Sequence, residues 1–172
     1  ICACLVGSEM CIRDSIGTAA TIRSRSYEKL LRQLVPGAEI TARPCPLFVP
    51  LVENGFLGED DPIPRLTAER YLAPLMEAGV DVLILGCTHY PLLEPVIRRV
   101  MGEGVTLIDS GRETALECRR FLLAHDLAAP QGAESSRRFY VSDRTEGFAG
   151  IAEILLGENL EGQVERIDIE RY

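Results

Sequence analysis

The sequence predicts an α/β protein whose parallel sheet is covered by helices. From Ile16 onward, short apolar runs alternate with helical stripes of apolar residues, the pattern of strands and helices in turn. Residues 82–85 are apolar throughout and end in Gly86, which suits a strand buried on both faces. Pro91 stands where the first turn of a helix accepts proline, so this strand is expected to lead directly into a helix.

The other elements follow from apolar spacing and from stop signals. The first helix should end at Pro36, and its inner face is expected at Tyr27, Leu30, Leu31 and Leu34. Gly79 is expected as a helix C-terminal cap. We expect strands at residues 39–42, 82–85, 105–108, 137–142 and 164–169, and helices at residues 52–56, 65–78, 112–127 and 146–156.

Charge and composition argue against several classes of partner. The 172 residues carry a net charge of -8, and no basic cluster is denser than Arg137-Arg138, which disfavours nucleic acid and membrane surfaces. No run of about 18 apolar residues is present to span a bilayer. The six cysteines fit no bridging scheme, so free thiols in a reducing, cytoplasmic setting are expected. We expect Cys45 to be structural and Cys118 to pack in the core.

The first 15 residues stand apart from this pattern. Residues 1–15 show no clean helical or strand period, and residues 4–15 resemble a translated sequencing adaptor. We interpret them as a non-native lead and leave them out of the fold prediction, so Cys2, Cys4 and Cys11 receive no catalytic role. The alternative is a genuine N-terminal strand and turn.

Cys87 is the strongest candidate for chemistry. In open α/β sheets, ligands bind beyond the carboxyl ends of the strands, and Cys87 stands there, before a helix N-terminus. His89 can exchange protons with the thiol or hold its charge. A buried structural cysteine or half of a zinc site are the alternatives. The metal is the least favoured, because the chain offers no second Cys/His pair at ligand spacing.

Other polar residues carry weaker signals. Thr18 and Thr21 follow a predicted strand end and precede a helix, where hydroxyl and N–H groups can hold a carboxylate. An ordinary helix cap explains them equally well. Glu53, taken alone, has the pattern of a solvated surface charge, and His125 is expected to face water near the end of a helix.

Three blocks of sequence together resemble glutamate racemases, within the aspartate/glutamate racemase group. They are Gly-Thr-Ala-Ala-Thr-Ile-Arg-Ser at residues 17–24, Cys-Pro-Leu-Phe-Val-Pro-Leu-Val-Glu at residues 45–53 and Gly-Cys-Thr-His-Tyr-Pro-Leu-Leu at residues 86–93. The resemblance runs from Ile16 to the C-terminus, where residues 139–143 and Phe148 look like the family's last segment.

The resemblance implies a cofactor-independent, two-thiol interconversion of L- and D-glutamate. It makes Cys87 one acid/base thiol, assisted by His89, with Glu53 near both. Removing an α-proton without pyridoxal phosphate or a metal requires a base on one face of the carbon and an acid on the other. No cofactor and no metal are expected. The residues expected to contact the polar groups of the glutamate substrate are Thr18, Thr21 and Thr88.

The family also sets expectations for organisation and setting. Its other thiol lies in an Asn-Thr-containing loop of an N-terminal half that has no counterpart here. We therefore expect a complete three-layer α/β domain at residues 16–108 and an incomplete second α/β domain at residues 109–172. Exposed apolar faces are expected on the helix at 112–127 and the strand at 164–169, and this chain alone should be inactive and poorly stable there.

Cytoplasmic supply of D-glutamate for peptidoglycan, by an enzyme that commonly forms homodimers, is implied in the same way. Two rival interpretations remain. One is a racemase of the same group that acts on aspartate or another small substrate, which the block at residues 45–53 disfavours. The other is a non-catalytic binding fragment, or one half of a split enzyme whose partner supplies the second thiol.

Overall fold

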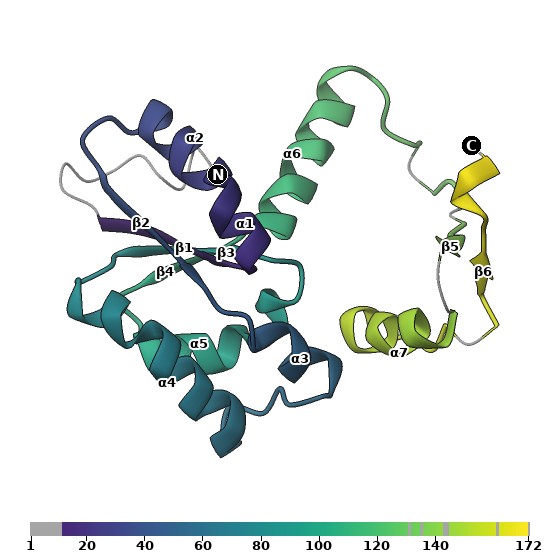
Figure 1. Cartoon of the computed structure of the whole chain (residues 1–172). Coiled ribbons are helices and arrows are strands. Elements are labelled where there is room, and N and C mark those ends of the chain that lie inside the picture. Colours follow the sequence, from purple (N-terminus) through teal and green to yellow (C-terminus); the bar gives the residue numbers. More distant parts are fainter. Residues whose placement is uncertain (1–11, 131, 135, 143–144, 161, 172) are drawn as a thin grey trace. The chain divides into compact units, whose positions relative to one another are not determined.

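The computed structural model describes residues 12–130, 132–134, 136–142, 145–160 and 162–171. The chain forms two compact units, which divide between Leu127 and Ala128. The first unit contains a four-stranded parallel sheet in the order β2-β1-β3-β4 (Figure 1), which confirms the predicted α/β class. Its strands are β1 (Ile12–Gly17), β2 (Glu39–Pro44), β3 (Val82–Gly86) and β4 (Thr106–Asp109).

Helices cover both faces of this sheet and give the three-layer arrangement that the resemblance implied (Figure 1). The helices near β1 and β2 are α1 (Ala19–Ser24) and α2 (Ser26–Leu34). The opposite face carries α3 (Phe48–Glu53), α4 (Pro62–Glu77), the 3-10 turn η2 (Tyr90–Leu93) and α5 (Glu94–Met101). Pro91 was expected in the first turn of an α-helix; it lies in the first turn of the 3-10 turn η2, and the α-helix itself begins at Glu94.

β3 is the centre of the core because every one of its residues is buried. Leu83 and Leu85 face the larger apolar cluster, which α3, α4 and α5 complete. Val82 and Ile84 face the smaller cluster on the other side, with Leu31 of α2. Alternate side chains of a strand point to opposite faces, so one continuous apolar run serves both layers.

The inner face of α2 differs from the expected one. Only Leu31 is buried, whereas Leu30 is 48% and Leu34 is 43% exposed. Tyr27 is half-buried and packs with Leu31 against the smaller cluster, so one side of the apolar stripe meets the sheet. Leu30, turned by about 100° from Leu31, and Leu34, the last residue of the helix, do not. The expectation that Leu30 and Leu34 face the core is therefore wrong.

β1 begins at Ile12, whereas we expected the fold to begin at Ile16. Residues 12–15 pair with residues 39–42 of β2, and residues 13–15 pair with residues 82–84 of β3. Strands pair through their backbone N–H and C=O groups and not through their side chains. Polar residues can therefore form the strand between β2 and β3. Residues 12–15 thus form part of a strand, and the interpretation of residues 1–15 as a non-native lead stays a prediction. Cys2, Cys4 and Cys11 lie outside the described residues.

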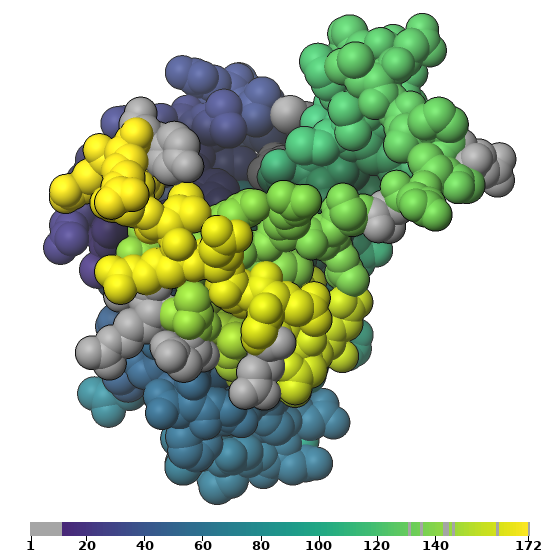
Figure 2. Space-filling view, turned by 90° about the vertical axis from the view of Figure 1, so that its right-hand side faces the viewer, coloured from purple at the N-terminus to yellow at the C-terminus, as the bar shows by residue number. Residues whose placement is uncertain are grey.

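The helix α6 (Ser110–Ala124) starts directly after β4, remains with the first unit and contacts β3 and β4. None of its residues is buried, and its surface is drawn in green in Figure 2. The apolar side chains exposed on and just after it are Leu116, Phe121, Leu122, Leu123 and Leu127. The predicted exposed face is confirmed, and the expected core role of Cys118 is wrong because Cys118 is exposed. Ser110 and Glu113, at the start of this helix, are half-buried, and the rest of the helix is exposed.

The second unit contains two parallel strands, β5 (Phe139–Val141) and β6 (Val164–Arg166), with the helix α7 (Thr145–Leu156) and a 3-10 turn at Ile169–Arg171. Phe139 and Phe148 pack with ring centroids 6.3 Å apart. The expected exposed apolar face of a strand at residues 164–169 is confirmed only in part. Ile169 is 67% exposed but lies in the 3-10 turn, and Val164 and Ile167 are half-buried. None of the helices among the described residues is long and apolar enough to cross a membrane.

Asp14 is an acidic residue buried in β1. Its carboxylate accepts hydrogen bonds from Thr41 Oγ1 and from the Ser15 backbone N–H, both at 2.6 Å, yet the side chain is fully buried. Burial raises the pKa of Asp14 above its ordinary value of 3.8, more than the hydrogen bonds and the charge of Arg43 lower it.

We predict that Asp14 lowers the free energy of unfolding as the pH rises from about 3.8 through its raised pKa. Over that window the unfolded chain releases the proton while the folded chain retains it, so ionisation opposes folding. Urea unfolding at a series of pH values should show a steeper fall for the wild type than for Asp14→Asn. Equal slopes for the two proteins would contradict the assignment.

Candidate functional site

The site lies at the carboxyl edge of the four-stranded sheet. Gly17 at the end of β1 pairs with Pro44 at the end of β2 and with Gly86 at the end of β3. The loops that follow these three strands therefore leave the sheet at one level. Thr18, Cys45 and Cys87 are the first residues of those loops, so the parallel register gathers the three predicted blocks of sequence.

Cys87 and His89 lie next to each other in the loop after β3. The Cys87 thiol is half-buried, and its Sγ is 3.9 Å from His89 Nδ1. The hydroxyl of Thr88 is 3.2 Å from the same ring nitrogen. The loop is closed by a hydrogen bond from the Tyr90 N–H to the Cys87 carbonyl, at 3.2 Å. The predicted pairing of thiol and imidazole is therefore present in the folded chain.

Glu53 approaches the other ring nitrogen of His89. Its Oε1 is 3.4 Å from His89 Nε2, an ion-pair distance when the imidazole is protonated. Nε2 is buried and makes no hydrogen bond within the described residues, so the Glu53 carboxylate lies at ion-pair distance without the alignment of a hydrogen bond. A proton held at Nε2 leaves Nδ1 as an acceptor that faces the Cys87 thiol.

Tyr90 joins the loop after β3 to the loop after β2. Its hydroxyl donates to the Cys45 carbonyl at 2.9 Å, and its ring lies edge-on to Phe48, with centroids 5.2 Å apart. Phe48 begins α3 and Glu53 ends it. Because Tyr90 is fully buried and follows His89 directly, these contacts fix α3 relative to the histidine. Tyr90 received no role from the sequence, although its place in the third block of sequence was a signal.

Thr18 and Thr21 lie at the start of α1. Thr18 caps this helix, because its Oγ1 accepts from the Thr21 N–H at 3.3 Å. The two hydroxyl oxygens are 3.0 Å apart. The cap interpretation is thus correct, and the same hydroxyls remain half-buried at the edge where Cys87 lies. Their contact with a ligand stays a prediction.

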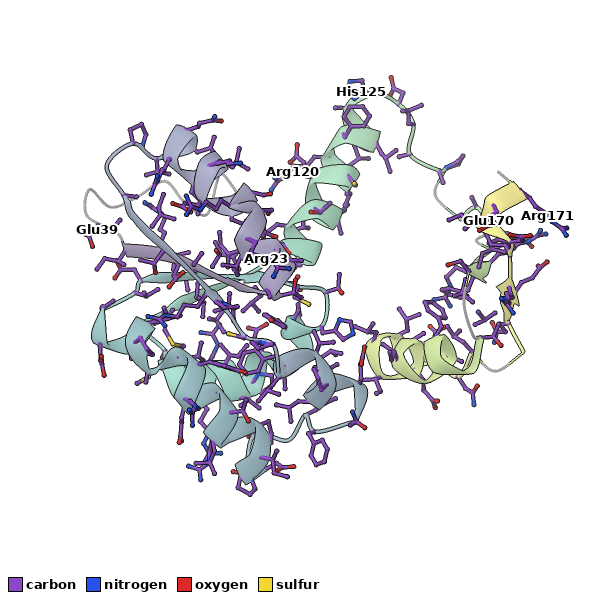
Figure 3. All side chains as sticks on the ribbon, viewed as in Figure 1. Arg23, Glu39, Arg120, His125, Glu170 and Arg171 are labelled. Carbon is purple, nitrogen blue, oxygen red and sulfur yellow. The ribbon has the colours of Figure 1, made fainter. Side chains whose placement is uncertain are left out.

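The other cysteines and the second histidine lie in different environments. Cys45 is fully buried, as expected of a structural residue, and burial with the nearby Asp14 charge raises the pKa of its thiol to about 12. His125 is exposed at the end of α6 and stacks on Phe121 with centroids 4.0 Å apart (Figure 3). Within the described ranges, no group of three or more His, Cys, Asp or Glu side chains is arranged to hold a metal ion.

The fold and the site define an α/β protein with a thiol, an imidazole and a carboxylate aligned at the carboxyl edge of its sheet. A family model described as Asp/Glu/Hydantoin racemase matches residues 16–118. The chain therefore belongs to the aspartate/glutamate/hydantoin racemase family.

Curated relatives and solved structures agree with this family. The chain is 44% identical to a glutamate racemase of Geobacter metallireducens over 155 residues, which cover 90% of this chain and 56% of that protein. It resembles the crystal structure of a glutamate racemase isoform of Bacillus anthracis, with a TM-score of 0.81, 36% identity and coverage of 91% of this chain and 57% of that one. The glutamate racemase of Francisella tularensis, solved in complex with D-glutamate, gives a TM-score of 0.86 and 28% identity, over 99% of this chain and 62% of that one. The chain thus spans less than two thirds of the length of these relatives.

Cys45 offers a test of the site's electrostatics. Because burial raises its pKa to about 12, almost no Cys45 thiolate exists at neutral pH in the folded chain. We predict that iodoacetamide labels Cys118 and leaves Cys45 unmodified until the chain is denatured, as measured by peptide mapping. Labelling of Cys45 at the rate of exposed Cys118 in the folded chain would show that the Cys45 environment is described wrongly.

Proposed function

We propose that this chain is the part of a glutamate racemase that supplies one of two acid/base thiols, with Cys87 as that thiol. The observation that carries the proposal is the alignment of Glu53, His89 and Cys87 at the carboxyl edge of the sheet. Ligands of open α/β sheets bind at this edge. The relatives named glutamate racemase, at 41% to 44% identity among the first matches, support glutamate as the substrate class.

The proposed chemistry is proton transfer at one face of the α-carbon. The Cys87 thiolate takes the α-proton, an S–H bond forms, and the electron pair of the broken C–H bond stays on the substrate as a carbanion stabilised by its carboxylate. In the reverse direction the Cys87 thiol donates that proton. His89 resets the protonation of the thiol through Nδ1, and Glu53 stabilises the imidazolium that forms.

The substrate contacts are proposed from hydroxyl groups at the same edge. Thr18 and Thr21 present their oxygens at the start of α1, and Thr88 stands exposed between Cys87 and His89. Hydroxyl groups of this kind hydrogen-bond to the carboxylate and amino groups of an amino acid. We assign these three threonines to binding and no cofactor to the reaction.

The second acid/base group has to act from the opposite face of the substrate. Cys45 does not suit that role, because it is fully buried and its pKa is raised to about 12. Cys118 lies exposed on α6, and the hollow beside it is lined by Thr114, Glu117, Phe121 and Leu122, none of which belongs to the proposed site. We therefore propose that the second thiol comes from outside the described residues, and that the complete enzyme supplies D-glutamate to cell-wall synthesis in the cytoplasm.

The proposal predicts that racemisation depends on Cys87 once the site is completed. The chain would be co-expressed with the segment of the Geobacter metallireducens racemase that it does not match, and the optical rotation of L-glutamate followed. Cys87→Ser should lower the rate by roughly a hundredfold or more, the usual contribution of an acid/base group, whereas Cys118→Ser should leave it unchanged. Equal rates for wild type and Cys87→Ser, or preferred turnover of L-aspartate, would contradict the proposal.

A further inference from the structure

We propose that Ser110 is a positioning residue that holds the end of β3 in place, and with it the Cys87 loop. The inference rests on the proposed function, since it concerns the loop that carries the proposed thiol. The observation behind it is a hydrogen bond from the Ser110 hydroxyl to the Leu85 carbonyl, at 3.0 Å. Leu85 is fully buried and lies two residues before Cys87.

The bond forms where the sheet ladder between β3 and β4 ends. Leu85 is paired with Asp109, the last residue of β4, and α6 begins at Ser110. From that point the chain turns away as a helix, so β4 no longer lies beside β3. A carbonyl oxygen can accept two hydrogen bonds, and the Ser110 side chain adds one at the last residue before Gly86. The hydroxyl thus extends the link between the two strands by one step.

Ser110 is itself held firmly. Asp109 caps α6, because its Oδ1 accepts from the Gly111 N–H at 2.8 Å and from the Arg112 N–H at 3.2 Å. The Thr114 hydroxyl donates to the Ser110 carbonyl at 2.7 Å. A serine whose carbonyl and neighbouring residues are hydrogen-bonded can hold another group in place, whereas a mobile surface serine cannot.

The other side of the same segment is held by Gly86. A Cβ atom at Gly86 would come 2.8 Å from the Ile16 carbonyl oxygen and 2.9 Å from Tyr27 Cε2, so the backbone there lies tight against β1 and α2. The residue pair before Cys87 is therefore bounded by β1 on one side and by Ser110 on the other. Loss of the Ser110 hydroxyl would release the second of these restraints and let Cys87 shift relative to His89.

Ser110 is proposed as a positioning residue and not as a group that reacts with the substrate. Its hydroxyl proton is used on a backbone carbonyl, so its effect on Cys87 is through the position of the loop. Thr67 makes the same kind of bond within α4, from its hydroxyl to the backbone carbonyl of Ile63 at 2.8 Å. Thr67 therefore provides a matched control, because its bond involves neither Ser110 nor the reference thiol of Cys118.

The experiment measures the alkylation of Cys87 by iodoacetamide relative to Cys118 in the folded chain, by peptide mapping at several pH values. We predict that Ser110→Ala lowers this ratio by roughly three- to tenfold, as expected when a reacting group is slightly misplaced, and that Thr67→Ala leaves it unchanged. A ratio for Ser110→Ala within about twofold of the wild type, or an equal fall for Thr67→Ala, would overturn the inference.

A second pair of variants distinguishes the effect of the Ser110 hydroxyl from the effect of side-chain size. Ser110→Thr and Ser110→Val introduce side chains of the same shape, and only threonine keeps the hydroxyl. The ratio should stay near the wild-type value in the threonine variant and fall in the valine variant; equal ratios in both would overturn the inference. Racemisation by the completed enzyme is a separate readout. If the Ser110 variants change the alkylation ratio but the completed enzyme does not racemise glutamate, the proposed function is wrong and the positioning role of Ser110 is retained.

Discussion

The close approach of β3 to β1 at Gly86 is the constraint on which the site depends. No side chain fits at this position, because the carbonyl oxygen of Ile16 and the ring of Tyr27 occupy the space. The strands therefore end level with each other, and the loops after β1, β2 and β3 leave at one edge. Cys87 is the next residue, so its position follows from a backbone contact that only glycine permits.

Buried contacts fix the reacting groups in position relative to that edge. Tyr90 links its own loop to the Cys45 carbonyl and to Phe48, and α3 then brings Glu53 to His89. The residues that make these contacts, Tyr90, Phe48 and Cys45, are fully buried, whereas the Glu53 side chain is 44% exposed. The arrangement is typical of a site whose chemistry lies at the surface while its geometry is fixed in the core.

The sequence predicted the sheet and the site better than it predicted surfaces. The apolar run of β3 and the strand-to-helix position of Cys87 are local signals, and both were correct. Exposure of Leu34 and Cys118 depends on which layer covers each helix, and helical spacing carries no information about that. The strand at residues 12–15 was missed because residues 1–15 have no clean strand period and were set aside as a non-native lead, yet β2 and β3 pair with the backbone of residues 12–15. The role of Ser110 was missed because a single hydrogen bond from a hydroxyl to a backbone carbonyl produces no repeating pattern in the sequence.

The central claim is that Cys87 and His89 act as one acid/base unit. The most direct measurement is the rate of alkylation of Cys87 and Cys118 between about pH 6 and pH 9, in the wild type and in His89→Gln. Access favours Cys118, which is exposed while Cys87 is half-buried. The account predicts that Cys87 nevertheless reacts faster near neutral pH, and that His89→Gln removes this advantage. Matching pH profiles for the two thiols, unchanged by His89→Gln, would contradict it.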